Sequence, residues 1–207
     1  FEGAQGTLLD IDYGIMYPFL TSSHPTSAGA CLSTGLAPNR IDRIVGVVKA
    51  YISRVGEGPF PTELTDDVGI RIREMGNEYG TATGRPRRVG WLDLVLLNYA
   101  ARLNGLTEIT LTKVDILDEM PEIKVAIAYE VDGKKIDRVP SDPKILPLLK
   151  PVYKTFPGWL SHTGDLKTGD KLPENLLQFL KFIRKSVGVP VTFLGVGSRR
   201  SQMVELG

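Results

Sequence analysis

The sequence is poor in the side chains that build disulfide frameworks and metal cages. It has one cysteine, Cys31, and two histidines, His24 and His162, among 207 residues. One cysteine excludes an internal disulfide and a cysteine-based metal cage, and two histidines do not suffice for a histidine-rich metal site. The single cysteine fits a reducing compartment. We assign no chemical role to Cys31 or to His24.

The sequence also lacks a charge imbalance and a long hydrophobic run. With 25 Lys+Arg and 24 Asp+Glu, the formal net charge is +1, so we expect no nucleic-acid arm and no electrostatic membrane anchor. The most apolar stretch, which begins at Trp91, contains Asp93 and Arg102, so we expect no membrane-spanning helix. Small anionic ligands remain possible, because they need only a local basic cluster.

Two common catalytic motifs are absent. The sequence contains no G-x-x-x-x-G-K-[ST] phosphate loop and no G-x-S-x-G nucleophile elbow. Hydrophobic residues nevertheless make up 42% and charged residues 24%, which is ordinary for a globular protein with a substantial core. The chain opens with Phe1 rather than Met, and its first six residues resemble the exit from a strand. We therefore expect a fragment of a longer protein.

Apolar spacing predicts an α/β fold with a mostly parallel central sheet, flanking helices and a small β-hairpin. Asp132-Gly133 is the hairpin signal, and Gly188 is expected to end the last helix. Residues 1–37 and 80–90 are expected to be loops, and 140–171 irregular. The predicted helices are 40–53, 67–79, 91–103 and 173–188; the predicted strands are a segment ending near Lys113, then 122–130, 135–139 and a final strand from Val189.

Thr112-Lys113-Val114-Asp115 follows the end of a predicted strand and is a candidate guanine site. An Asp carboxylate can accept hydrogen bonds from guanine N1–H and from the 2-amino group, a pattern that adenine does not offer. The Lys stem can lie along the purine ring. The alternative interpretation is a strand followed by an ordinary surface Lys and Asp.

Two loops are further candidates. The turn Gly195-Val196-Gly197-Ser198 follows the last predicted strand, where α/β folds bind ligands, although it could be a simple exit turn. The basic segment Arg85-Pro86-Arg87-Arg88 follows Thr81, Thr83 and Gly84 and suits a carboxylate or phosphate. Its alternative is a solvated face.

The opening segment offers polar groups on a glycine-rich backbone. Gln5 lies between Ala4 and Gly6, so its amide can approach a ligand closely. Thr21-Ser22-Ser23 offers three hydroxyls after Tyr17-Pro18. Both features could instead be ordinary loop caps.

Taken in order, seven segments resemble the adenylosuccinate synthetase family, and the match runs over essentially all 207 residues. They are FEGAQGTLLDID, YPF.TSS, RVGEGPFPTEL, GNEYGTATGRPRRVGWLD, LTKVDILD, PGW and GVPVTFLGVG. The resemblance implies a GTP-dependent ligase that joins aspartate to IMP. In that chemistry GTP phosphorylates the 6-oxygen of IMP, Mg²⁺ stabilises the transferred phosphoryl group, and the aspartate amine then displaces phosphate. It also implies a cytoplasmic homodimer.

The resemblance assigns ligands to individual positions of this chain. For IMP it implies Gln5, Thr21 and Arg85. For aspartate it implies Val55, Thr81, Ala82, Thr83, Gly84 and Arg85. For GTP it implies Arg87, Lys113, Val114, Asp115, Gly195, Val196 and Gly197. Residues 1–90 would thus carry the IMP and aspartate loops, and residues 91–207 the guanine-binding part.

The chain departs from the family pattern in three ways. Ala82 stands where many members have Thr, which removes a hydroxyl from the aspartate loop, and Gly195 stands where Ser is common. The family's phosphate loop, catalytic Asp and catalytic His have no counterpart here. We therefore expect the catalytic pair and the Mg²⁺ ligands in an N-terminal part of the enzyme, and none in this C-terminal portion. The alternative is a GTP-binding module or an inert fragment without ligase chemistry.

Overall fold

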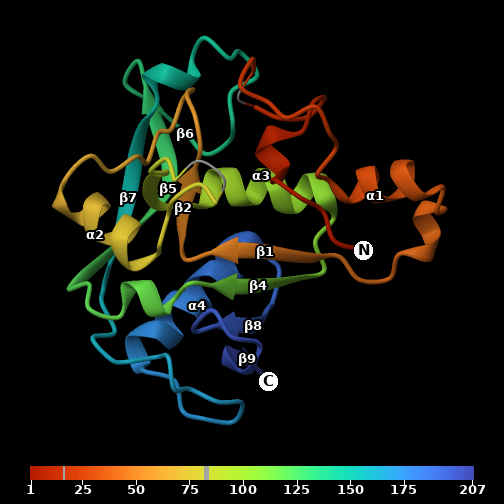
Figure 1. Cartoon of the computed structure of the whole chain (residues 1–207). Helices are drawn as coiled ribbons and strands as arrows, with labels where there is room; N and C mark the ends of the chain where they lie inside the picture. Colours follow the sequence, from red (N-terminus) through yellow and green to blue (C-terminus); the bar gives the residue numbers. More distant parts are fainter. Residues whose placement is uncertain (16, 82–83) are drawn as a thin grey trace.

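The computed structural model describes residues 1–15, 17–81 and 84–207. Its first sheet contains β1 (Val45–Lys49), β4 (Glu108–Thr112), β8 (Val191–Gly195) and β9 (Met203–Glu205) in that order (Figure 1). β1, β4 and β8 are parallel, and β9 is antiparallel to β8. The strand ending near Lys113 and the last strand are confirmed, as is the α/β class.

The second sheet lies beside the first and is built around its longest strand, which pairs with three others. It contains β2 (Tyr51–Arg54), β3 (Arg88–Asp93), β5 (Glu122–Val131), β6 (Lys134–Ile136) and β7 (Lys150–Pro157). β3 and β5 are parallel, and the other pairs are antiparallel. Asp132 and Gly133 both have positive φ, 50° and 69°, so the predicted hairpin turn is confirmed.

The described chain has the helices α1 (Ser27–Thr34), α2 (Asp67–Met75), α3 (Leu94–Asn104) and α4 (Glu174–Val187). α4 buries Leu176, Phe179 and Ile183 in the main core, and Gly188 with φ 73° ends it as predicted. α3 crosses above the first sheet in Figure 1, and α4 lies at the level of β4 and β8. No helix of the described residues is long and apolar enough to cross a membrane.

Several predicted elements differ from the structure. The helix predicted over 40–53 is wrong, because this segment forms β1 and β2. The two strands flank Ala50 in the sequence and belong to different sheets. Its apolar residues are mostly β-branched, and such side chains favour strands. The helix predicted from Trp91 begins at Leu94, because Trp91–Asp93 completes β3. α1, β3, β7 and β9 were not predicted; β7 holds two prolines, which an edge strand tolerates.

Candidate functional site

The carboxyl ends of three parallel strands meet at one edge of the first sheet. β1 ends at Lys49, which is paired in register with Thr112, the last residue of β4. Leu111 is paired with Leu194, so β8 ends beside them at Gly195. In open α/β sheets, ligands bind outside this edge.

The chain turns sharply where β4 ends. Lys113 has φ 63°, a left-handed conformation that redirects the backbone after the strand. Its Nζ donates a 2.6 Å hydrogen bond to the carbonyl of Gly76, at the end of α2. The backbone N–H of Val114 lies 3.4 Å from the carbonyl of Gly195 and donates to it. The structure thus brings the two predicted guanine segments together.

A cavity of about 620 Å³ opens beside these segments. Its lining includes Asp115 and Val196 from the predicted guanine site, together with Met75 and His162. Burial raises the pKa of Asp115 above its ordinary value. Oδ1 of Asp115 is buried and has no hydrogen-bond partner among residues 1–15, 17–81 and 84–207. A buried acceptor of this kind is suited to a donor on a ligand.

Small residues keep the loop after β8 close to its neighbours. A Cβ atom on Gly195 would lie 3.1 Å from Cγ2 of Thr112, and one on Gly197 would overlap the side chain of Gln202. Gln202 accepts a hydrogen bond from the backbone of Arg199 (3.1 Å) and donates to Gly164 (3.0 Å). Gln202 therefore shapes this loop, and no sequence motif singled it out.

The predicted aspartate loop connects α2 to β3. Backbone hydrogen bonds from Gly80 to Arg85 (2.8 Å) and from Gly84 to Gly80 (2.7 Å) hold it together. Gly84 has φ 63°, and the side chains of Thr81 and Arg85 are exposed. The predicted residues Ala82 and Thr83 lie outside the described part of the chain.

The base of this loop rests on a buried carboxylate, Glu78. Arg87 Nη1 donates to Glu78 Oε2 at 2.8 Å, while Lys49 Nζ and the Tyr51 hydroxyl each donate to Oε1 at 2.6 Å. Burial alone would raise the pKa of Glu78, but the three donors outweigh it and lower the pKa to about 2. Glu78 was not predicted as a site residue.

Val55 lies beside the same loop base. Arg54, the last residue of β2, is paired with Arg88, the first residue of β3, so Val55 and Arg87 leave the strand pair at the same end. The Val55 side chain is 58% exposed. Val55 therefore follows β2 at the same end of the strand pair at which Arg87 leads into β3.

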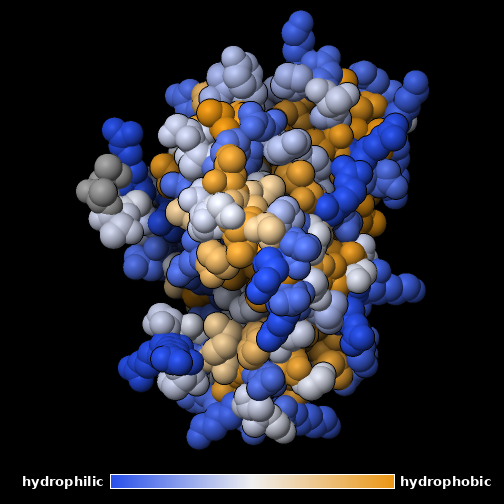
Figure 2. All heavy atoms as spheres, turned by 90° about the vertical axis from the view of Figure 1, so that its right-hand side faces the viewer, coloured by the Kyte–Doolittle hydropathy of each residue, from blue (hydrophilic) through white to orange (hydrophobic). Residues whose placement is uncertain are grey.

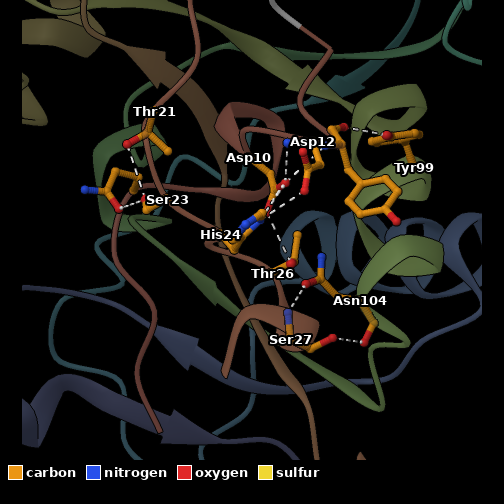
Figure 3. A network of polar contacts seen from close by, with 11 residues as sticks. Asp10, Asp12, Thr21, Ser23, His24, Thr26, Ser27, Tyr99 and Asn104 are labelled. Atoms are coloured by element: carbon orange, nitrogen blue, oxygen red, sulfur yellow. Dashed lines mark hydrogen bonds and ion pairs between the residues drawn. The ribbon is translucent and has the colours of Figure 1, made fainter. Parts of the chain in front are cut away.

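Ser23 joins the predicted IMP residues Gln5 and Thr21. Its hydroxyl donates to Gln5 Oε1 at 3.4 Å and lies 3.3 Å from the hydroxyl of Thr21 (Figure 3). This segment also touches the Val55 loop, because a Cβ on Gly58 would lie 2.8 Å from Cδ2 of Phe19. The segments predicted for IMP and for aspartate therefore meet at Phe19 and Gly58.

A buried aspartate organises the backbone behind these groups. Asp10 accepts hydrogen bonds from the N–H groups of Asp12 (2.9 Å) and Tyr13 (3.0 Å) and from the Thr26 hydroxyl (3.3 Å). His24 Nδ1 lies 3.5 Å from Asp10 Oδ1 (Figure 3). These contacts make the Asp10 cluster a scaffold for the opening segment.

Outside residues 16, 82 and 83, no group of three or more His, Cys, Asp or Glu side chains could hold a metal ion.

Comparison with known proteins decides the family. The adenylosuccinate synthetase family model matches residues 1–204. The chain belongs to the adenylosuccinate synthetase family. It is 51% identical over 203 residues to adenylosuccinate synthetase of Thermomicrobium roseum, covering 98% of this chain and 47% of that protein. It is 53% identical over 205 residues to the Halothermothrix orenii protein, covering 99% and 47%.

A solved structure of a family member has the same fold. The fully ligated adenylosuccinate synthetase from Plasmodium falciparum matches with a TM-score of 0.95 and 39% identity, over 99% of this chain and 49% of that one. The chain thus spans about half the length of the curated relatives and of the solved structure that it matches.

Proposed function

We propose that this chain forms the substrate-binding part of an adenylosuccinate synthetase that uses GTP to join aspartate to IMP. The observation that carries the proposal is the unpartnered Oδ1 of Asp115 at a cavity beside the ends of β4 and β8. Family membership supports a ligase of purine biosynthesis.

In this proposal Asp115 reads the guanine base of GTP. Its carboxylate accepts hydrogen bonds from N1–H and from the 2-amino group, which leaves no buried acceptor unsatisfied. The stem of Lys113 lies along the ring, fixed by the bond from its ammonium to Gly76. The backbone of Gly195, Val196 and Gly197 covers the other edge of the base.

Aspartate and IMP bind at the loops of the second sheet and the opening segment. Arg85 pairs with the aspartate carboxylate and contacts the IMP ribose, a task suited to its planar fork of donors. Val55, Thr81, Ala82, Thr83 and Gly84 complete the aspartate site. Gln5 and Thr21 bind IMP, and Arg87 binds GTP.

The reaction places a phosphoryl acceptor, a phosphoryl donor and an amine close together. The residues of this chain bind and orient the three substrates, which converts an encounter in solution into a step within one complex. Mg²⁺ would stabilise the transferred phosphoryl group when bound. We propose that its ligands and the catalytic Asp and His come from the rest of a family-length enzyme, which would be a cytoplasmic homodimer.

A nucleotide-binding measurement tests the guanine site directly. Isothermal titration of the 207-residue chain with GDP and with ADP should show preference for GDP of at least about a hundredfold, the value of two charge-assisted hydrogen bonds. Equal affinities would remove the basis for the proposed base recognition. Formation of adenylosuccinate from IMP, aspartate and GTP by a full-length family enzyme carrying this sequence tests the reaction.

The second candidate is a GTP-binding module without ligase chemistry. It is favoured by the unpartnered Oδ1 of Asp115, which suits a guanine edge without needing the loop residues proposed for aspartate. The two candidates differ at the aspartate loop and at Gln5 and Thr21. If a full-length enzyme binds GTP but turns over neither IMP nor aspartate, the second candidate holds.

A further inference from the structure

Glu78 ties three separate elements together at the base of the aspartate loop. Its fully buried side chain receives Lys49 from the end of β1, Tyr51 from the start of β2 and Arg87 from the loop. The Glu78 carbonyl also accepts the backbone N–H of Arg87 at 2.8 Å. Glu78 therefore holds both the start and the end of the loop segment 79–86.

The same short segment reaches the guanine cavity. Glu78 follows Gly76, whose carbonyl accepts the Lys113 ammonium, and Met75, which lines the cavity. A Cβ on Gly76 would overlap the Tyr51 hydroxyl, so the close approach that leads to Glu78 requires glycine. Residues 75–78 thus connect the guanine site to the aspartate loop through direct contacts.

We propose that Glu78 is a positioning residue that holds Arg87 and the aspartate loop in register with the guanine site. This inference rests on the proposed function and deepens it. One carboxylate between two cations leaves the loop base positive, which suits an anionic nucleotide. Arg87 has little freedom to move while Glu78 holds it by a side-chain and a backbone bond.

The test is Glu78→Gln in a full-length family enzyme that carries this sequence. Loop displacement should raise KM for aspartate about 10- to 100-fold and lower kcat, because small errors in substrate position are costly in rate. KM for IMP should rise less than KM for aspartate, since Gln5 and Thr21 lie on another segment and only Arg85 is shared with the loop.

Glu108→Gln is the matched control. Glu108 is also buried and accepts hydrogen bonds from Arg43 (2.7 and 2.9 Å) and Thr192 (2.8 Å), but it begins β4, at the opposite end from the site. Both variants lose a carboxylate that is hydrogen-bonded to a cationic side chain, and both should lower Tm. Only Glu78→Gln should alter the kinetics of aspartate.

Tyr51→Phe covers the case in which Glu78→Gln does not fold. It removes one donor from Glu78 and keeps the buried ring, so it should raise KM for aspartate about 3- to 10-fold. The inference is overturned if the parent enzyme is active and each folded Glu78 or Tyr51 variant has the kinetic constants of Glu108→Gln. An inactive parent enzyme would instead overturn the proposed function.

Discussion

At the scale of single residues, we expect Asp115 to determine which base the cavity accepts. Asp115→Asn replaces one acceptor with a donor, which then faces the N1–H and amino group of guanine. Losing two charged hydrogen bonds should cost GTP roughly 3–5 kcal/mol. Xanthosine triphosphate, with a carbonyl in place of the 2-amino group, should be relatively favoured. The measurement is kcat/KM of the full-length variant with both nucleotides.

Asp165→Asn is the control for this switch. Asp165 lines the same cavity, but its side chain is almost fully exposed, so its substitution should leave nucleotide preference unchanged. If Asp115→Asn lowers kcat/KM for both nucleotides by the same factor, Asp115 is structural and the base is read elsewhere.

Substitution of Arg85 should affect the use of aspartate more than the binding of GTP. Arg85→Lys keeps the charge but loses the planar fork, so the change is not conservative. We expect KM for aspartate to rise about tenfold and turnover to fall, with the affinity for GTP little changed. Arg71→Lys, on α2 and paired with Glu119, is a control of the same chemistry. If Arg85→Lys weakened only the binding of GTP, our assignment of the loop to aspartate would be wrong.

The site residues that the sequence predicted lie on contiguous motifs. Lys113, Val114 and Asp115 follow one another after a strand, so a local pattern suffices to find them. Glu78 accepts a hydrogen bond from Lys49, which is 29 positions away in the sequence. Gln202 donates one to Gly164, which is 38 positions away. Such contacts exist only after folding, so composition and spacing could not predict them.

At the scale of elements, a buried carboxylate at the junction of β3 and α3 should make the stability of the fold depend on pH. The side chain of Asp93 caps α3 through the N–H groups of Val95 and Leu96 and accepts the Tyr129 hydroxyl at 2.6 Å. Burial raises the pKa of Asp93 to about 6 despite these hydrogen bonds, which oppose the shift. The folded protein therefore holds this proton at pH values where the unfolded chain has released it.

This raised pKa predicts that stability falls as pH rises from about 4 to about 6. Across that window the Asp93 contribution should lower the free energy of unfolding by about 3 kcal/mol. Asp93→Asn cannot titrate and should lack this component. Urea unfolding of both proteins at pH 4 and pH 6.5 gives the difference, and parallel changes in the two proteins would contradict the prediction.

Local signals predicted elements well where turn chemistry or a helix stripe dominates. The turn signal Asp132-Gly133 predicted the hairpin correctly. The apolar stripe that includes Leu176, Phe179 and Ile183 predicted α4 correctly. The segment from Val45 to Arg54 has helical spacing as well as β-branched residues, and pairing with β4 and β3 decided between them. That pairing is tertiary, so periodicity alone predicted the wrong element.

At the scale of the whole molecule, the first sheet has an open edge. Among described strands β1 pairs only with β4, and its Val47 side chain is 74% exposed. Figure 2 shows hydrophobic side chains scattered among hydrophilic ones on the face at the right of Figure 1. An exposed apolar edge strand can accept another strand. The rest of a family-length enzyme, about half of it, is the partner that we expect there.

We predict that the 207 residues alone bind guanine nucleotides but do not make adenylosuccinate. The catalytic Asp and His that the family resemblance implies have no counterpart in this sequence, and acid–base groups contribute roughly 10²–10⁴-fold each. Adding the N-terminal half of a family enzyme in trans should restore product formation from IMP, aspartate, GTP and Mg²⁺. Val47→Lys on β1 should weaken this complementation, because it places a charge on the edge that the added half would cover. Robust turnover by the 207 residues without the added half would show that the chain contains its own catalytic groups.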